Sequence, residues 1–322
     1  MSTGHFFGVR YHRHMLKDSA RTGGYQKAMD ALVSEGDVVV DVGAGTGVMS
    51  IFAARAGARK VYALESTPVA RLARRIIEEN GLTDKIEVIE ADAATVSLPE
   101  PADLIVTECM GNFVYSDAML GVLERCRRLL KPDGRVCPSR IEISLGPTFL
   151  APIFGEFAFW EKPRYGIDFG VAREAAVNDT YNIQCPSMQL LSAPPARYGE
   201  IRPSEPVPAA DRTVDFTVAR SGPIDTVLGW FDAELADGIV LKTGPGNSTH
   251  WGQVAFPVPP FLAEAGGVLR FHLSVTRGHM DLPTYAWSGE YRDPSGVLRL
   301  RFTRSQDFRF SPEQATTERF ED

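Results

Sequence analysis

The stretch Val38-Val39-Val40-Asp41-Val42-Gly43-Ala44-Gly45-Thr46-Gly47 decides the fold. It begins with β-branched residues, a pattern typical of a parallel strand that is buried on both faces. The glycines that follow allow a sharp turn, and they predict a helix over residues 48–57. Backbone N–H groups and a helix N-terminus come close together at such a turn, so we expect a ligand to bind there.

Strands and helices alternate on both sides of this stretch. The sequence predicts a helix over residues 14–33 before it, and strands at 60–65, 86–90 and 103–107 with helices at 67–80 and 117–130 after it. Lys131-Pro132-Asp133-Gly134 is expected to stop the last helix. The alternation predicts an α/β fold of Rossmann-like type, with a doubly wound sheet and a ligand at the carboxyl ends of its strands.

The pattern changes near residue 140, where apolar segments shorten and alternate with polar residues. Further strands are expected at 213–218, 226–234, 238–243, 252–256, 268–276, 284–291 and 297–303. This half predicts an antiparallel β sandwich or barrel. We therefore expect an N-terminal helical lid (1–34), a ligand-binding domain (35–140) and an antiparallel β-barrel domain (141–322).

The composition narrows the classes of partner. The 322 residues carry a net charge of -7, which argues against nucleic acid and suits a cationic substrate. No apolar segment is long enough to cross a membrane, and no export signal begins the chain, so we expect a cytoplasmic protein without a membrane partner. The spacing of the four cysteines and six histidines predicts no metal site.

The glycine turn itself indicates which ligand binds. Its spacing differs from that of dinucleotide-binding turns, and no lysine follows it as in a P-loop. Glu65 ends the next predicted strand and is placed to accept the hydroxyls of a ribose. Together with Asp41, Gly43, Gly45 and Gly47, it resembles the S-adenosylmethionine site of class I methyltransferases. Asp92 suits an adenine amino group, although it also fits a solvated loop acid.

Two carboxylates lie in one loop after the strand at 103–107. Glu108 ends the strand, and Asp117 sits where the next helix should begin. A guanidinium is planar and cationic at physiological pH. Two carboxylates could hold it by charge-assisted hydrogen bonds and localise its positive charge away from the attacking nitrogen.

This loop resembles the double-glutamate loop of protein arginine methyltransferases, and three other stretches agree: the His12 to Tyr25 segment, Thr249-His250-Trp251, and the aromatic segment at 150–177. The resemblance implies that Glu108 and Asp117 are catalytic and that His250 pairs with Asp18 to orient them. It also implies a homodimer formed by a helical arm at 150–177. By the same resemblance, Arg21 and His12 contact the cofactor, and the substrate pocket includes Met15, Met110, Trp251 and Phe6.

Three positions depart from this family. Asp117 replaces a glutamate and is one methylene shorter. Phe6 stands where the family has the second of two tyrosines, and Asn112-Phe113 changes the pocket wall after Gly111. We expect the shorter acid and the reduced lid to alter substrate choice.

The expected reaction is methyl transfer from S-adenosylmethionine to an arginine-type guanidinium. The alanine-, arginine-, glycine- and proline-rich composition is typical of bacterial proteins, so free L-arginine or a small guanidino compound of specialised metabolism is expected ahead of an arginine-containing peptide or protein. Two further alternatives stay open. One is an amine or hydroxyl acceptor, and the other is a non-catalytic scaffold that binds the cofactor.

Overall fold

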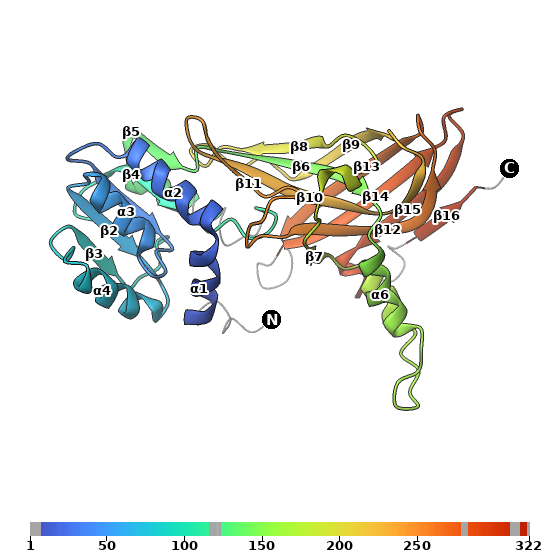
Figure 1. The fold of residues 1–322 in the computed structure, drawn as a ribbon, viewed down its shortest axis with the longest axis horizontal. Coiled ribbons are helices and arrows are strands. Elements are labelled where there is room, and N and C mark those ends of the chain that lie inside the picture. The colour runs from blue at the N-terminus through green and yellow to red at the C-terminus, as the bar shows by residue number, and fades with distance from the viewer. Residues whose placement is uncertain (1–7, 116–120, 122–123, 278–282, 310–315, 321–322) are drawn as a thin grey trace.

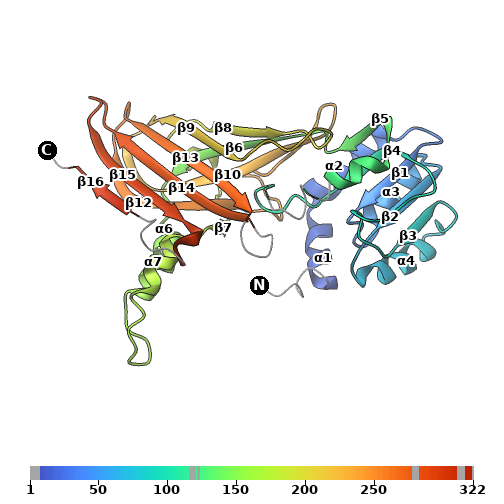
Figure 2. The ribbon, with the colours of Figure 1, turned by 180° about the vertical axis from the view of Figure 1, so that it is seen from behind.

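A computed structural model describes residues 8–115, 121, 124–277, 283–309 and 316–320. A parallel sheet with its helices occupies one end of the molecule, and two antiparallel sheets occupy the other (Figures 1 and 2). One hydrophobic core runs through both halves and includes Val39 of the parallel sheet and Phe256 and Phe302 of the antiparallel sheets.

The parallel sheet has the strand order β3-β2-β1-β4-β5. Its strands are β1 (Val38–Val42), β2 (Lys60–Leu64), β3 (Ile86–Ile89), β4 (Ala102–Thr107) and β5 (Leu130–Cys137), with helices α3 (Val48–Ala56) and α4 (Val69–Glu79) between them. The central strand β1 is buried along its whole length, as its β-branched run predicts. This confirms the predicted doubly wound α/β arrangement.

The N-terminal segment is two helices and not the single helix predicted over residues 14–33. Helix α1 (Val9–Lys17) ends at Asp18, and α2 (Ser19–Leu32) begins there because the Asp18 side chain accepts the Arg21 backbone N–H at 2.9 Å. Helix α2 packs on α3. It also contacts two strands of the β half, β10 (Gly222–Ala236) and β11 (Ile239–Lys242). Asp18 therefore turns the chain where the two halves meet.

Helical structure ends before Lys131-Pro132-Asp133-Gly134, as predicted, but these residues do not form a turn and lie inside β5. A short 3-10 helix, η2 (Arg127–Leu129), precedes the strand. Strand β5 forms the sheet edge, and its pairing with β4 shifts register between Leu130 and Arg135. An edge strand tolerates Pro132, and turn-forming residues fit an irregularity in the ladder.

The second half contains two antiparallel sheets that face each other. One has the order β7-β12-β10-β6-β8 with β11 beside β10, and the other has the order β16-β15-β14-β13-β9. Their strands are β6 (Arg140–Thr148), β7 (Tyr181–Ile183), β8 (Ala196–Ile201), β9 (Asp211–Thr217), β10 (Gly222–Ala236), β11 (Ile239–Lys242), β12 (Gln253–Ala263), β13 (Val268–Arg277), β14 (Pro283–Arg292), β15 (Leu298–Ser305) and β16 (Thr316–Arg319). All seven strands expected here from the sequence are confirmed, whereas no hydrogen-bonded ladder closes the two sheets into one barrel among the described strands.

Helices α6 (Ala151–Trp160) and α7 (Ala172–Val177) fall within the predicted arm. Figure 1 shows α6 and the loop after it projecting from the body of the molecule. Two more 3-10 helices, η3 (Met188–Leu190) and η5 (Gln306–Arg309), join strands of the β half. None of the helices within the described ranges has the length and apolar character needed to cross a membrane.

Candidate active site

The glycine turn after β1 has the backbone geometry that the sequence predicted. Gly43, Gly45 and Gly47 have φ values of 74°, 54° and 81°, which favour residues without a Cβ. A Cβ on Gly45 would lie 2.9 Å from Cε1 of His12, so the histidine ring lies directly over the turn. The Gly45 N–H donates to Glu65 Oε2 at 2.9 Å. The turn is therefore held between α1 and the end of β2.

A buried nitrogen supports the assignment of a cofactor to this turn. Nε2 of His12 is buried and has no hydrogen-bond partner among the described residues. Burial lowers the pKa of His12, which favours the neutral imidazole. Its ring lies in a cavity with Met15, Arg21, the glycine turn and Glu108. A buried polar atom without a partner is costly, so a ligand that hydrogen-bonds there suits the site.

Asp41 is the buried acid at the end of β1. Its Oδ2 accepts the backbone N–H of Ser50 at 2.9 Å and the Ser50 hydroxyl at 2.6 Å. Burial raises the pKa of Asp41 to about 6, against the opposing effect of the Ser50 hydrogen bonds. An acid with a raised pKa holds its proton more strongly in the folded than in the unfolded protein.

Asp41→Asn is therefore expected to change how stability depends on pH. In the wild type, folding retains the Asp41 proton between about pH 4 and pH 6, so stability falls by about 3 kcal/mol as pH rises through that window. Asparagine keeps an acceptor for Ser50 but cannot titrate, so the variant should lack this part of the slope. Urea unfolding at several pH values measures it, and equal slopes for the two proteins would contradict the assignment.

Arg21 and Glu108 form a buried ion pair. The Nε of Arg21 donates to Glu108 Oε2 at 2.7 Å, and Nη2 of the same guanidinium donates to the same oxygen. Both side chains are 7% exposed. The hydroxyl of Tyr25 donates to the Thr107 carbonyl at 2.8 Å, which fixes α2 against the end of β4. The residue predicted to hold the cofactor thus contacts the predicted catalytic acid directly.

Asp18 and His250 join the two halves beside this pair. Asp18 Oδ2 accepts the backbone N–H of His250 at 2.7 Å and lies 2.9 Å from its Nδ1. Burial raises the pKa of Asp18, but the hydrogen bonds from His250 and from the Arg21 backbone outweigh it and hold this pKa below its usual value. The His250 ring packs against the Trp251 ring, with centroids 3.9 Å apart and an interplanar angle of 44°. The contact between Asp18 and His250 agrees with the pairing that the resemblance implied for them.

The loop after Glu108 inserts its aromatic residues into the β half. Phe113 packs on Phe256 and Tyr285, with ring centroids 5.5 and 6.1 Å apart. A Cβ on Gly229 of β10 would lie 2.3 Å from the Phe113 ring, so glycine is required there. Asp117 lies outside the described residues, as does Phe6.

The remaining predicted residues lie in different surroundings. Met15 lines the cavity, whereas Met110 and Trp251 are fully buried and do not line it. Asp92 is exposed, and its carboxylate accepts the Ala94 N–H at 2.8 Å, as in a solvated turn. Tyr11 is a neighbour of Glu108 that the sequence did not indicate. Burial, followed by the charge of Glu108, raises the pKa of the Tyr11 hydroxyl. Tyr11 lies just outside the quoted motif, and nothing in the sequence singled it out.

Comparisons with known proteins agree with this geometry. A family model described as a methyltransferase domain matches residues 39–134. The chain is 33% identical over 262 residues to protein arginine N-methyltransferase 6 of Danio rerio, covering 76% of this chain and 75% of that protein. It is 31% identical over 285 residues to the histone-arginine methyltransferase CARMER of Anopheles gambiae, covering 82% of this chain and 46% of that protein. The chain thus spans about half the length of that second relative.

Two solved structures have the same fold over almost the whole chain. The Trypanosoma brucei PRMT1 enzyme-prozyme heterotetrameric complex with AdoHcy matches with a TM-score of 0.85 and 25% identity, covering 93% of this chain and 98% of that one. Protein arginine methyltransferase 10 of Arabidopsis thaliana matches with a TM-score of 0.82 and 28% identity, covering 94% and 98%.

Proposed function

Because this chain belongs to the S-adenosylmethionine-dependent protein arginine methyltransferases, we propose that its substrate is an arginine within a peptide or protein. The relatives are named for protein and histone arginine, which supports this alternative over the free arginine that the composition led us to expect. The observation that supports a guanidinium as the acceptor is the buried Glu108 carboxylate beside the cofactor turn, held by Arg21.

The residues around the glycine turn are suited to the cofactor. We assign Arg21, His12, Asp41, Gly43, Gly45, Gly47 and Glu65 to its binding. The two carboxylate oxygens of Glu65 accept hydrogen bonds from the N–H groups of Gly45 and Thr67. Each oxygen retains a second lone pair that can accept a ribose hydroxyl. The bound cofactor supplies a methyl group on a positively charged sulfur.

Glu108 is the residue we assign to the substrate guanidinium. Its carboxylate accepts guanidinium N–H groups and draws positive charge toward itself, so that another nitrogen regains lone-pair character for the attack. Asp117 is proposed as the second acid. The methylated nitrogen must lose one proton. His250 is the base that we propose, because Asp18 orients its Nδ1 side and leaves Nε2 for the proton.

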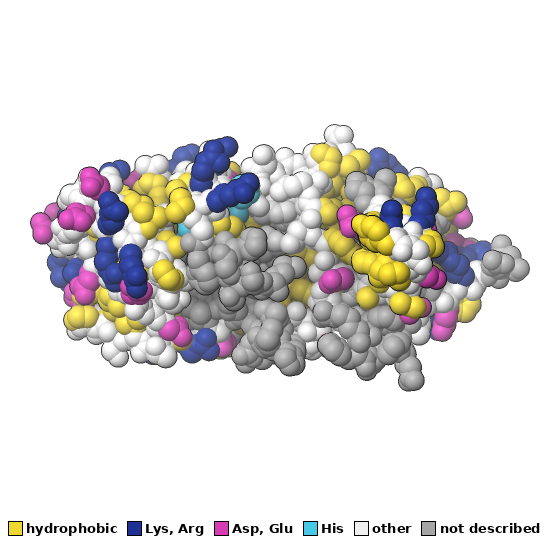
Figure 3. Space-filling view, turned by 90° about the horizontal axis from the view of Figure 1, so that it is seen from below, with side chains coloured by type: hydrophobic (Ala, Val, Ile, Leu, Met, Phe, Trp, Pro, Cys, Tyr) yellow, Lys and Arg dark blue, Asp and Glu magenta, His cyan; other side chains and the backbone are white. Residues whose placement is uncertain are grey.

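We also propose a homodimer formed by the arm. Its exposed apolar side chains include Phe159, Tyr165, Ile167 and Val171. Figure 3 shows hydrophobic side chains gathered over this end of the molecule. A patch of this kind on a projecting element is typical of an interface. The trypanosomal relative is described as a heterotetrameric complex, which supports assembly in this family. Ultracentrifugation that finds only monomers would contradict the dimer.

One competition experiment tests the substrate. The purified protein is incubated with S-adenosylmethionine, free L-arginine and an arginine-containing peptide, and the products are identified by mass spectrometry. We expect methylated peptide to predominate. Methylation of free arginine alone would overturn the proposal, and methylation of amines or hydroxyls alone would indicate a different acceptor. Cofactor binding without methyl transfer to any acceptor would indicate a non-catalytic scaffold.

A further inference from the structure

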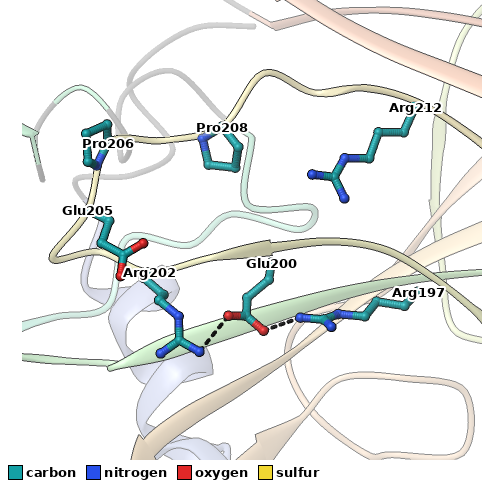
Figure 4. A pocket seen from close by; sticks show the side chains of 7 residues that line it. All are labelled: Arg197, Glu200, Arg202, Glu205, Pro206, Pro208 and Arg212. Carbon is teal, nitrogen blue, oxygen red and sulfur yellow. Dashed lines mark hydrogen bonds and ion pairs between the residues drawn. The ribbon is translucent and has the colours of Figure 1, made fainter.

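A second pocket in the β half shares no lining residue with the cavity around Glu108. It has a volume of about 390 Å³ and lies between β8, the loop 202–210 and the start of β9. Its lining residues are Arg197, Glu200, Arg202, Glu205, Pro206, Pro208 and Arg212 (Figure 4). Three arginines and two glutamates therefore face one pocket.

The charge of Glu200 is already shared among arginines. Its carboxylate accepts from Arg197, lies 2.7 Å from Arg202 Nη2, and is 3.6 Å from Nη1 of Arg140. Arg212 makes only a long contact of 3.5 Å to the Tyr198 carbonyl, and no carboxylate within the described ranges pairs with it. The Arg212 guanidinium, directed toward the middle of the pocket in Figure 4, is thus left with unused donors.

Glu205 does not neutralise Arg212, because it lies at the opposite end of the pocket. Figure 4 shows Arg197 and Arg212 at one end and Glu205 at the other. The loop that carries Glu205 is tied down by Arg127, whose Nε donates to the Pro203 carbonyl at 3.0 Å and whose Nη2 donates to the Glu205 carbonyl. The backbone therefore holds Glu205 away from Arg212. Arg197 shares its charge with Glu200 and with Glu142, whose Oε2 lies 3.3 Å from its Nε, so the cationic charge at that end of the pocket is that of Arg212.

This pocket adjoins the loop that carries the two acids. Tyr115, near the end of the described part of that loop, packs on Tyr198 with ring centroids 6.2 Å apart, and the Tyr198 carbonyl faces Arg212. Arg127, which ties down the pocket wall, follows the same loop in the chain. An extended peptide advances about 3.3 Å per residue, so the second to eighth residues on either side of a bound arginine cover distances of about 7 to 26 Å from it.

We propose that this pocket binds an acidic side chain of the peptide substrate, an inference that rests on the proposed function. A carboxylate matches the planar donor array of arginine, and the pair formed is a charge-assisted hydrogen bond. The carboxylate pairs with Arg212, at the end of the pocket away from Glu205. The pocket thereby selects substrates in which an acidic residue accompanies the methylated arginine.

The test uses paired peptides that contain a single arginine. Aspartate is placed in turn at the second to eighth position on either side of the arginine, and each peptide is compared with its asparagine counterpart. At one or more positions we expect the aspartate peptide to have a KM about three to ten times lower, with similar kcat. Arg212→Gln should remove this preference while leaving the KM for the asparagine peptides unchanged.

Arg270→Gln is the matched control. Arg270 is an exposed arginine of β13, paired with Asp215 at 2.8 Å, and it does not line this pocket. This variant should keep the preference for aspartate. Equal KM values for every aspartate and asparagine pair, or a preference that survives Arg212→Gln, would overturn the inference. Methylation of free arginine without any methylated peptide would overturn the proposed function as well, so the two failures are distinguishable.

A separate measurement with inorganic phosphate tests whether the pocket binds a free anion. If the pocket serves a dissolved anion and not the substrate, phosphate should raise the melting temperature of the wild type but not of Arg212→Gln, with no preference among the peptides. That result would also overturn the assignment to the peptide.

Discussion

Glu108→Gln is expected to lower kcat by about 100-fold to 10,000-fold. Glutamine keeps the size of the side chain and removes its charge, so the guanidinium loses the carboxylate that draws its positive charge aside. The Glu108 side chain is only 7% exposed, so water cannot readily replace this interaction. Turnover with the best peptide, measured at saturating cofactor, gives the size of the loss.

Cofactor affinity should not fall in the same variant. Glu108 accepts from two donor groups of Arg21, and this contact competes with any other anion that approaches Arg21. Removing the charge of Glu108 releases Arg21, so calorimetry should give an unchanged or smaller Kd for S-adenosylmethionine. Glu100→Gln is the matched control, because Glu100 pairs with Arg59 at the surface. Wild-type turnover in Glu108→Gln would refute the assigned role.

The parallel sheet could be predicted because its signals are local. The β-branched run at 38–42 can bury both faces only as a central strand, and the glycines at 43, 45 and 47 mark positive φ. The break at Asp18 could not be predicted in this way. The Asp18 carboxylate caps α2 locally by accepting the Arg21 N–H, but its other oxygen accepts the N–H of His250, which is far away in the sequence.

The same limit applies to β5. Lys131-Pro132-Asp133-Gly134 has the composition of a turn, and only its place at the edge of the finished sheet makes it part of a strand. Strand position in a sheet is a property of the whole fold. A single stretch of sequence does not reveal it.

In the candidate site, the sequence motifs named residues that the structure brings together, but of the contacts between them only that of Asp18 with His250 was expected. The motifs named Arg21 and Glu108 for two different ligands, and the structure pairs them with each other across 87 positions of sequence. Asp18 and His250 were expected as a pair, and they are in contact. Tyr11 and Phe113 contribute through packing and proximity, which spacing along the chain does not encode.

Arg21→Met is expected to have the second large effect, on cofactor binding and on stability together. The apolar side chain leaves the Glu108 carboxylate buried without its cation, which should destabilise the cofactor-free protein by about 3–5 kcal/mol. The variant also lacks the cation that we assign to cofactor binding, so the Kd for S-adenosylmethionine should rise by about 100-fold. Urea unfolding and calorimetry measure the two effects separately.

The double variant Arg21→Met/Glu108→Gln separates charge from packing. With both charges removed, no uncompensated ion remains in the site, so most of the lost stability should return to within about 1 kcal/mol of the wild type. Cofactor affinity should stay low, because the donor groups of Arg21 are still missing. If the stability losses of the two single variants simply add, the ion pair does not contribute to stability. In that case Arg21 is not held by Glu108, and the expectation of unchanged or tighter cofactor binding in Glu108→Gln loses its basis.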